Sequence, residues 1–236
     1  MQFAYAPSLA ETFPALVTGL IVVAGVRADV DVGARVGELE AEAGRRLERV
    51  PEGELPEIRA WRAAYARMGL KPTRVRSASE ALLRRLRLHG SLPRLHPLVD
   101  LCNAASAAAA LPVAAFDLAR IGGSLLVGPA DGAERYLTFG GEIESPEPGE
   151  IVFRDDRGDV HARRWVSRQS GLSAVSGSTE DALIVIEGLH EGAERDVVAL
   201  RDRLAADVAA LWETPLRVGL LVGAAGAFDT EADARA

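Results

Sequence analysis

The chain has 236 residues, a formal net charge of −7, and 48% apolar and 26% charged residues. This length can bury one substantial core, and the composition is ordinary for a soluble globular protein. The single cysteine, Cys102, excludes an intramolecular disulfide and fits a reducing compartment. No apolar run is long enough to cross a bilayer and the N-terminus lacks a signal-peptide pattern. We therefore expect a cytoplasmic protein with no membrane contact.

The first half of the chain has the pattern of one strand followed by helices. A valine-rich apolar run predicts a buried strand over residues 16–26. Helical spacing of apolar residues and helix-breaking residues predict helices over 30–49, 55–68, 80–88 and 98–110. Ser77 and Glu80 have the spacing of a capping box at the start of one helix, and Gly90 marks its end.

After Pro112 the pattern changes to short β-like runs separated by turn residues. Strands are expected over residues 113–116, 124–127, 151–154, 160–166, 182–186 and 217–222. A hairpin turn is expected at 155–159, and an amphipathic helix over 191–212. We predict one α+β domain over residues 1–228 and a frayed tail over 229–236.

Positive charge is concentrated in one segment of this acidic chain. Residues 57–94 contain ten Lys/Arg, nine of them arginine, against only Glu57 and Glu80, a local balance of +8. The rest of the chain therefore sums to −15. A local concentration of positive charge attracts polyanions, and arginine holds phosphates and carboxylates bidentately. The alternative is a solvated helix face whose arginines pair with acids from elsewhere.

The usual catalytic signatures are absent from the sequence. The Gly223–Gly226 segment lacks the lysine and Ser/Thr of a P-loop, and no G-x-S-x-G elbow exists. The four histidines are scattered with no i, i+4 pair, so we expect no metal site and no cofactor. Cys102 lies in an apolar helix, which favours a core thiol over a nucleophile. An enzyme of this kind would use positioned water and backbone dipoles.

Three strings of residues carry a more specific pattern. They are the run 65–85 with its cations, Val99-Asp100-x-x-Asn103 followed by Pro112-x-x-Ala115-Phe116-Asp117, and Gly149-Glu150 followed by Arg163-Arg164-Trp165 and Arg168-Gln169-Ser170. Together they resemble the tRNA-editing domain of the phenylalanyl-tRNA synthetase beta subunit. They are more similar still to the free-standing members of that family, which lack a synthetase body. The resemblance covers residues 65–187.

This resemblance implies a fold and a partner. It implies an α+β domain with interwoven helices and a mixed β-sheet around a central cleft. In the synthetase the cleft receives the 3′ end of a mischarged tRNA and the wrong ester is hydrolysed. It thus implies tRNA as the partner, with no DNA expected. Residues implied at the pocket are Asn103, Ala114, Asp117, Arg168, Gln169 and Ala174. Residues implied at phosphates are Arg67, Lys71, Arg74, Arg76, Arg84 and Arg85.

The sequence also departs from the synthetase pattern. Ala114 stands where the synthetase carries a histidine, and Ala174 stands where it carries a glutamate. In the synthetase, that histidine and that glutamate help recognise the hydroxyl of a misplaced tyrosine. A site built to hydrogen-bond a hydroxyl discriminates strongly, so the tyrosine specificity is not carried over. Structural alternatives stay open: Asn103 can bond a neighbouring backbone, and Asp117 can cap the next turn.

Three functional hypotheses follow. The first is an aminoacyl-tRNA deacylase acting in trans on a mischarged tRNA. The second is a non-catalytic tRNA- or RNA-binding module that keeps the fold, motivated by Ala114 and Ala174. The third is an amino-acid or small-molecule binding protein that uses the same cleft without RNA. The sequence leaves the amino acid, the tRNA and the oligomeric state open.

Overall fold

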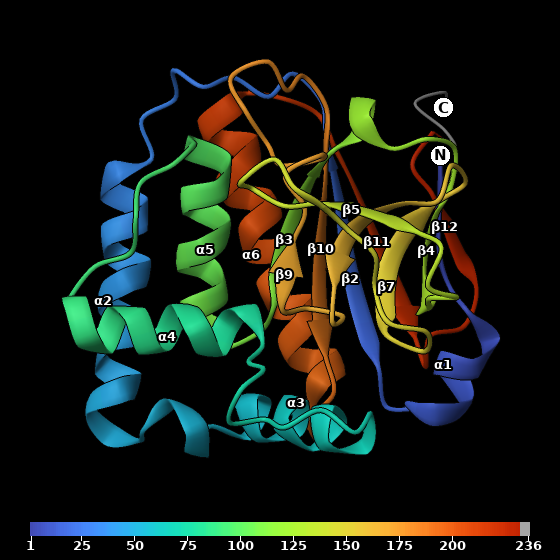
Figure 1. Ribbon diagram of the computed structural model, residues 1–236. Helices are drawn as coiled ribbons and strands as arrows, with labels where there is room; N and C mark the ends of the chain where they lie inside the picture. The colour runs from blue at the N-terminus through green and yellow to red at the C-terminus, as the bar shows by residue number, and fades with distance from the viewer. Residues whose placement is uncertain (232–236) are drawn as a thin grey trace.

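The computed structural model describes residues 1–231, which form three layers (Figure 1). Most of the helices lie on one side, a four-stranded antiparallel sheet lies in the middle, and a larger eight-stranded sheet, with the short helix α1 (Pro7–Thr12) beside it, lies on the other side. The larger sheet is mixed, because two of its neighbouring strand pairs run parallel while its other pairs are antiparallel. The predicted α+β class with a mixed sheet is confirmed.

The five predicted helices are present to within a few residues at their ends, and one short helix, α1, was not predicted. They are α1 Pro7–Thr12, α2 Gly33–Arg49, α3 Pro56–Arg67, α4 Ala78–His89, α5 Pro97–Ala109 and α6 Ala193–Trp212, with 3-10 turns at Glu52–Glu54 and Leu118–Arg120. The Ser77 side chain caps α4 by accepting from Glu80 N at 3.3 Å, and Gly90 ends it at φ +76°. Among the described residues, Glu80 does not complete the reciprocal half of the capping box, since its carboxylate binds Arg62 instead.

The strands include every predicted one and several that the sequence did not indicate. The middle sheet has the order β11-β2-β10-β3, with β11 Leu216–Val222, β2 Val17–Val23, β10 Ala182–Gly188 and β3 Val113–Asp117. The larger sheet has the order β12-β1-β4-β7-β8-β5-β6, with β9 paired to β8. Its strands are β1 Gln2–Tyr5, β4 Leu125–Pro129, β5 Arg135–Leu137, β6 Ile143–Glu144, β7 Ile151–Asp155, β8 Asp159–Arg163, β9 Arg168–Gln169 and β12 Ala227–Asp229.

Strand β10 separates two hydrophobic cores. Side chains alternate across a strand with a period of two. Ile184 and Ile186 therefore pack in the core under the helices, while Leu183 and Val185 pack in the core between the two sheets. Glu187 takes the next place on the second face, so the alternation puts a carboxyl group between the sheets.

Helix α6 packs on β2 and β10 at very short range. A Cβ atom added at Gly188 would lie 2.9 Å from Val197 Cγ2, and one added at Gly19 would lie 3.0 Å from Val197 Cγ1. Glycine is required at these two positions because any side chain would push the helix away from the sheet.

Two boundary predictions are corrected by the structure. The expected frayed tail is wrong for its first residues, because Asp229 pairs with Gln2 in β12 and the Thr230 hydroxyl donates to Met1 O at 3.0 Å. Residues 232–236 lie outside the described part of the chain. The strand expected over 160–166 ends at Arg163. No helix within the described residues is long and apolar enough to cross a membrane.

Candidate functional site

A pocket lies where the two sheets meet the start of α4. Its cavity volume is about 60 Å³, and its lining comes from β3, β7, β8, β10, residues 165–169 and Ala78, the first residue of α4. Most of the lining is apolar, with Phe153, Trp165 and Val185 among its walls. Its polar side chains are Ser167, Arg168, Gln169 and Glu187.

Glu187 is the most buried polar residue of this lining, with 2% of its surface exposed. Tyr5 Oη and Trp165 Nε1 both donate to Glu187 Oε1, each at 2.7 Å. Burial raises the pKa of Glu187 to about 7, against the opposing effect of these two donors. Within residues 1–231, Glu187 Oε2 accepts no hydrogen bond, although the residue lines the pocket.

The turn after β8 aims Trp165 at Glu187. Arg164 and Trp165 adopt left-handed φ angles of +48° and +57°, which are costly for residues other than glycine. Two backbone N–H groups hold the turn: Arg164 N donates to the side-chain oxygen Glu150 Oε1 at 3.1 Å, and Trp165 N donates to Ile151 O at 2.6 Å. The indole is fully buried and packs edge-on against Trp61, with ring centroids 5.0 Å apart. The turn is therefore fixed from several sides.

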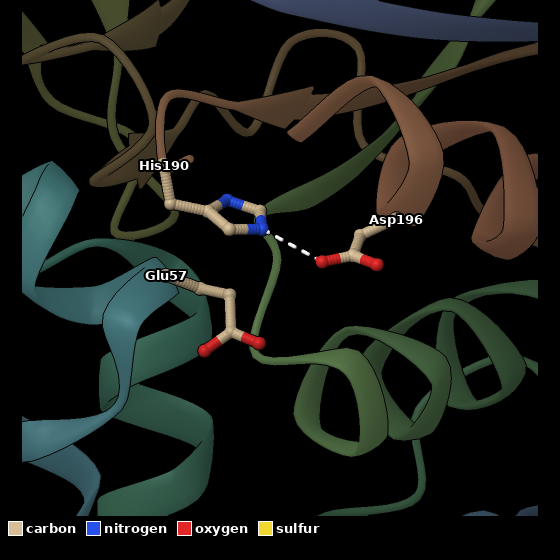
Figure 2. A group of neighbouring side chains, drawn as sticks. All are labelled: Glu57, His190 and Asp196. Carbon is tan, nitrogen blue, oxygen red and sulfur yellow. Dashed lines mark hydrogen bonds and ion pairs between the residues drawn. The ribbon is translucent and has the colours of Figure 1, made fainter. Parts of the chain in front are cut away.

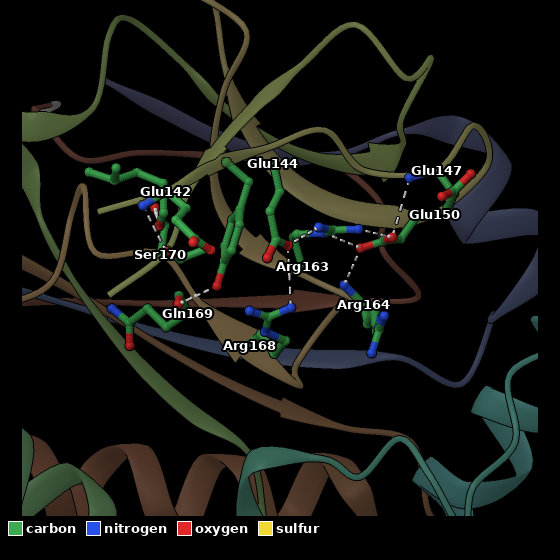
Figure 3. Close-up of polar contacts among 12 residues, drawn as sticks. Glu142, Glu144, Glu147, Glu150, Arg163, Arg164, Arg168, Gln169 and Ser170 are labelled. Atoms are coloured by element: carbon green, nitrogen blue, oxygen red, sulfur yellow. Dashed lines mark hydrogen bonds and ion pairs between the residues drawn. The ribbon is translucent and has the colours of Figure 1, made fainter. Parts of the chain in front are cut away.

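The rim of the pocket carries Arg168 and Gln169. Figure 3 shows Arg168 at the end of a chain of ion pairs that runs through Glu144 and Arg163 to Glu150. The Arg168 guanidinium lies 3.4 Å from Glu144 Oε2 and 5.4 Å from the Tyr136 ring centroid, while its side chain stays 40% exposed. Arg168 is thus oriented and still accessible.

Gln169 forms hydrogen bonds within the fold through both its side chain and its backbone. Its Nε2 donates to Ala115 O at 2.6 Å, and its backbone oxygen accepts from Tyr136 Oη at 2.7 Å. It therefore bridges β9, β3 and β5, and its side chain forms a fixed part of the pocket wall.

Three of the six predicted pocket residues line this pocket, namely Ala114, Arg168 and Gln169. Their part in binding remains a prediction. The structure does not bring Asn103, Asp117 and Ala174 to it. Asn103 is half-buried in α5, and Ala174 faces Phe116 in an isolated β-bridge.

Asp117 has the structural role that the sequence left open. It lies at the end of β3 opposite the pocket, where its Oδ1 accepts from Ala119 N at 3.0 Å and its Oδ2 from Thr179 Oγ1 at 2.9 Å. The carboxylate thus caps the following 3-10 turn and ties it to the loop before β10. Both oxygens accept hydrogen bonds within the fold, and Asp117 is buried and does not line the pocket.

The structure divides the ten cations of residues 57–94 into two groups. Four form ion pairs: Arg62 and Arg76 with Glu80, Arg87 with Glu52, and Arg94 with Glu40. The other six are exposed and have no carboxylate within 4.0 Å among residues 1–231; they are Arg59, Arg67, Lys71, Arg74, Arg84 and Arg85. Five of the six predicted phosphate-binding cations are therefore free to meet a polyanion, and Arg76 is the exception.

The free cations and the pocket are joined by one short segment. The loop between α3 and α4 carries Lys71 and Arg74 and leads directly into Ala78 (Figure 1). Ala78 N donates to Val166 O at 2.8 Å, and both residues line the pocket. A polyanion bound along this loop would reach the pocket wall at its end.

A cluster elsewhere has ligand atoms spaced for a cation. Figure 2 shows Glu57 of α3, His190 after β10 and Asp196 of α6 converging, and one ligand atom from each lies within 4.8 Å of the others. His190 Nε2 and Asp196 Oδ2 are 2.9 Å apart. Arg46 already donates to Glu57, and Arg195 to Asp196. These arginines supply counter-charge to the two carboxylates, so the cluster is part of an ion-pair network that ties three elements together.

A second group has the residue types of a hydrolytic triad. Ser173 Oγ lies 2.9 Å from His161 Nδ1, and His161 Nε2 lies 3.5 Å from Asp155 Oδ2. All three are buried, none lines the pocket, and burial lowers the pKa of His161. Asp155 also accepts from Gly122 N and from amides of the turn between β7 and β8. We therefore assign this group to the packing of that turn.

Comparison with known proteins places the chain in a family. The model of the B3/4 domain matches residues 60–199. This chain belongs to the B3/4 domain family. The match contains every free cation of residues 57–94 except Arg59, and every residue that lines the pocket. The family-level part of the sequence resemblance is thereby confirmed.

Other comparisons are more distant. The B3/4 chain gave no significant match among curated proteins. Among solved structures it is similar to an N-terminal fragment of the phenylalanyl-tRNA synthetase beta-subunit from Pyrococcus horikoshii. The sequence identity is 12% and the TM-score 0.47, over 91% of this chain and 50% of that chain. The B3/4 chain spans about half the length of that fragment.

Proposed function

We propose that this B3/4 domain is an aminoacyl-tRNA deacylase that acts in trans and hydrolyses the ester of a mischarged tRNA. One observation supports this most directly: a loop of unpaired cations leads into Ala78, which lines a largely apolar pocket. The 3′ end of a charged tRNA carries groups in an order that matches the cations followed by the apolar pocket. Its phosphates are followed by a terminal nucleoside and then by an amino acid.

The cations would act on the phosphates. Lys71, Arg74, Arg84 and Arg85 are exposed and unpaired within the described residues, so binding them to phosphate breaks no ion pair of the fold. Arg168 is the accessible cation at the pocket rim, beyond the end of this loop. It is placed to contact the terminal nucleotide, and its planar fork suits phosphate or ribose oxygens.

The pocket would hold the amino acid. A cavity of about 60 Å³ has room for about two water molecules, so it suits only a small side chain. An aminoacyl ester is already activated, and holding it beside one ordered water supplies much of the rate enhancement without a covalent nucleophile.

A non-catalytic RNA-binding module is the second candidate. It is favoured by one observation: apart from Glu187, the pocket lining contains no acid or histidine that could move a proton near neutral pH. This module would use the same cations and would bind tRNA with a strong salt dependence.

A panel of tRNAs, each charged with a different amino acid, tests the proposal. The protein is incubated with each, and loss of the ester is followed against buffer alone. We expect accelerated loss for a small amino acid, and slower loss with Arg74→Ala/Arg84→Ala. Arg120→Ala, which removes an exposed arginine outside the cation segment, is the matched control. No loss above buffer for any tRNA overturns the deacylase, and salt-dependent binding without turnover establishes the binding module.

A further inference from the structure

Glu187 differs from every other buried glutamate of the described residues. Each of the other four is ion-paired to an arginine: Glu52 with Arg87, Glu57 with Arg46, Glu80 with Arg62, and Glu134 with Arg154. Glu187 has no cation within 4.0 Å among residues 1–231. Within the described residues, its side-chain partners are two neutral donors, Tyr5 and Trp165, and both bind the same oxygen.

A buried carboxylate without a counter-charge is costly, and proteins usually pair such groups. Here the fold leaves the second oxygen, Oε2, without a donor, in a residue that lines the pocket. Tyr5 and Trp165 keep the carboxyl oriented, and Trp165 is itself held in a strained turn. The missing element at this site is a positively charged hydrogen-bond donor.

We propose that Glu187 binds a protonated primary amine of the ligand, and that the pocket thereby selects the free α-ammonium group of a small amino acid. As applied to an aminoacyl ester, this inference rests on the proposed function. The amine binds Glu187 Oε2, and the apolar walls, including Val113, Ala114 and Val185, contact the side chain. An ammonium–carboxylate contact out of water is among the stronger hydrogen bonds.

The test uses adenosine that carries alanine or valine through a 3′-amide, which no deacylase can remove as an ester. Each compound is compared with its N-acetyl derivative, which lacks the charged amine. Affinity is measured by calorimetry or NMR titration. We expect acetylation to weaken binding on the order of 10- to 100-fold, the usual range for a hydrogen bond to a charged group.

Glu187→Gln should remove the same preference, because its amide oxygen can still accept from Tyr5 and Trp165 but carries no charge. Glu191→Gln, an exposed glutamate just after β10, should leave it unchanged. Equal binding of free and acetylated compounds by the wild-type protein overturns the inference. That comparison stands even if the Gln variant does not fold.

The pH profile gives an independent readout. Tyr5 and Tyr65 interact with Glu187, but burial raises the pKa of both phenols, so they stay neutral near pH 7. The charged side chain on the pocket lining besides Glu187 is Arg168. Affinity for the free amine should therefore rise between pH 5.5 and about pH 7.5, as Glu187 ionises. An affinity that falls over this range means that the protonated acid donates the hydrogen bond, and it overturns the inference.

The two proposals fail separately. Ester loss from charged tRNA together with indifference to acetylation leaves the deacylase standing and removes the amine site. Glu187-dependent binding of the free amine without any ester loss leaves the amine site standing and removes the deacylase.

Discussion

The indole Nε1 of Trp165 lies 2.7 Å from Glu187 Oε1 and donates a hydrogen bond to it across the space between the two sheets. Trp165 stands in a left-handed turn after β8, and Glu187 stands near the end of β10. This contact joins the turn that forms one wall of the pocket to the acid at its buried end.

Replacing Trp165 with Phe should raise the pKa of Glu187 above its wild-type value of about 7, because the variant loses a donor that favours the ionised carboxylate. Loss of the hydrogen bond should also cost about 1–2 kcal/mol of stability. NMR titration of the carboxyl carbon measures the pKa. Trp212→Phe, whose indole donates to Arg27 O instead, should leave it unchanged. An unchanged pKa in Trp165→Phe would mean that this bond is not formed in solution.

Glu187 should make the protein less stable as the pH rises. Burial raises its folded pKa from 4.5 to about 7, so between these values the folded state keeps a proton that the unfolded state has lost. Its favourable contribution is full below pH 4.5 and is lost as the pH rises through about 7. The advantage of Glu187→Gln in free energy of unfolding should therefore grow by about 3 kcal/mol from pH 4.5 to pH 8.

Urea unfolding of both proteins at several pH values measures this difference. The other titrating groups are common to both chains and cancel. A difference that stays constant from pH 4.5 to pH 8 would show that Glu187 is not buried as described.

Paired and free arginines of the cation segment should behave differently. Arg62→Ala leaves the buried Glu80 carboxylate with only Arg76, at 3.4 Å, and should destabilise the fold by about 1–3 kcal/mol. Arg84→Ala/Arg85→Ala removes exposed, unpaired charges and should change stability by less than about 0.5 kcal/mol. The double variant should instead weaken tRNA binding and reduce the slope of log K against log salt by about 1–2. If Arg62→Ala and Arg84→Ala/Arg85→Ala affected stability and tRNA binding equally, the distinction between paired and free arginines would be wrong.

Gly188→Ala should destabilise the protein by about 1–3 kcal/mol, because the new Cβ would lie 2.9 Å from Val197 Cγ2 in a packed core. Gly37→Ala is the matched control: it lies in α2 with no atom within 4 Å of the added Cβ. That change should stabilise the helix by about 0.5–1 kcal/mol. Denaturant unfolding of the two variants should therefore shift in opposite directions.

Cys102 should be unreactive in the folded protein. The thiol is buried, and burial raises its pKa to about 12, so very little thiolate exists at pH 8. A chromogenic disulfide reagent should modify it only after urea unfolds the chain. Rapid modification without urea would show that α5 opens readily.

The local sequence pattern was enough to predict the helices and strands whose apolar residues recur at a regular spacing. The helices from α2 to α6 and the longer strands follow from apolar spacing, and the cap at Ser77 and the end at Gly90 follow from backbone chemistry. Strands β1, β5, β6, β9 and β12 could not be predicted, because each is two to four residues long. Such strands exist only through pairing with partners distant in the chain, which no local window contains.

The site, too, has features that the sequence predicted and features that only the tertiary structure decided. The sequence by itself determined the family, the concentration of cations in residues 57–94, and the candidates Ala114, Arg168 and Gln169. Only the tertiary structure decided which arginines are paired, that Asp117 caps a turn, and that Glu57, His190 and Asp196 meet. It also placed Glu187 between two sheets without a counter-charge. A side chain's partners and burial depend on which distant segments pack together, whereas period, charge and turn chemistry can be read along the chain itself.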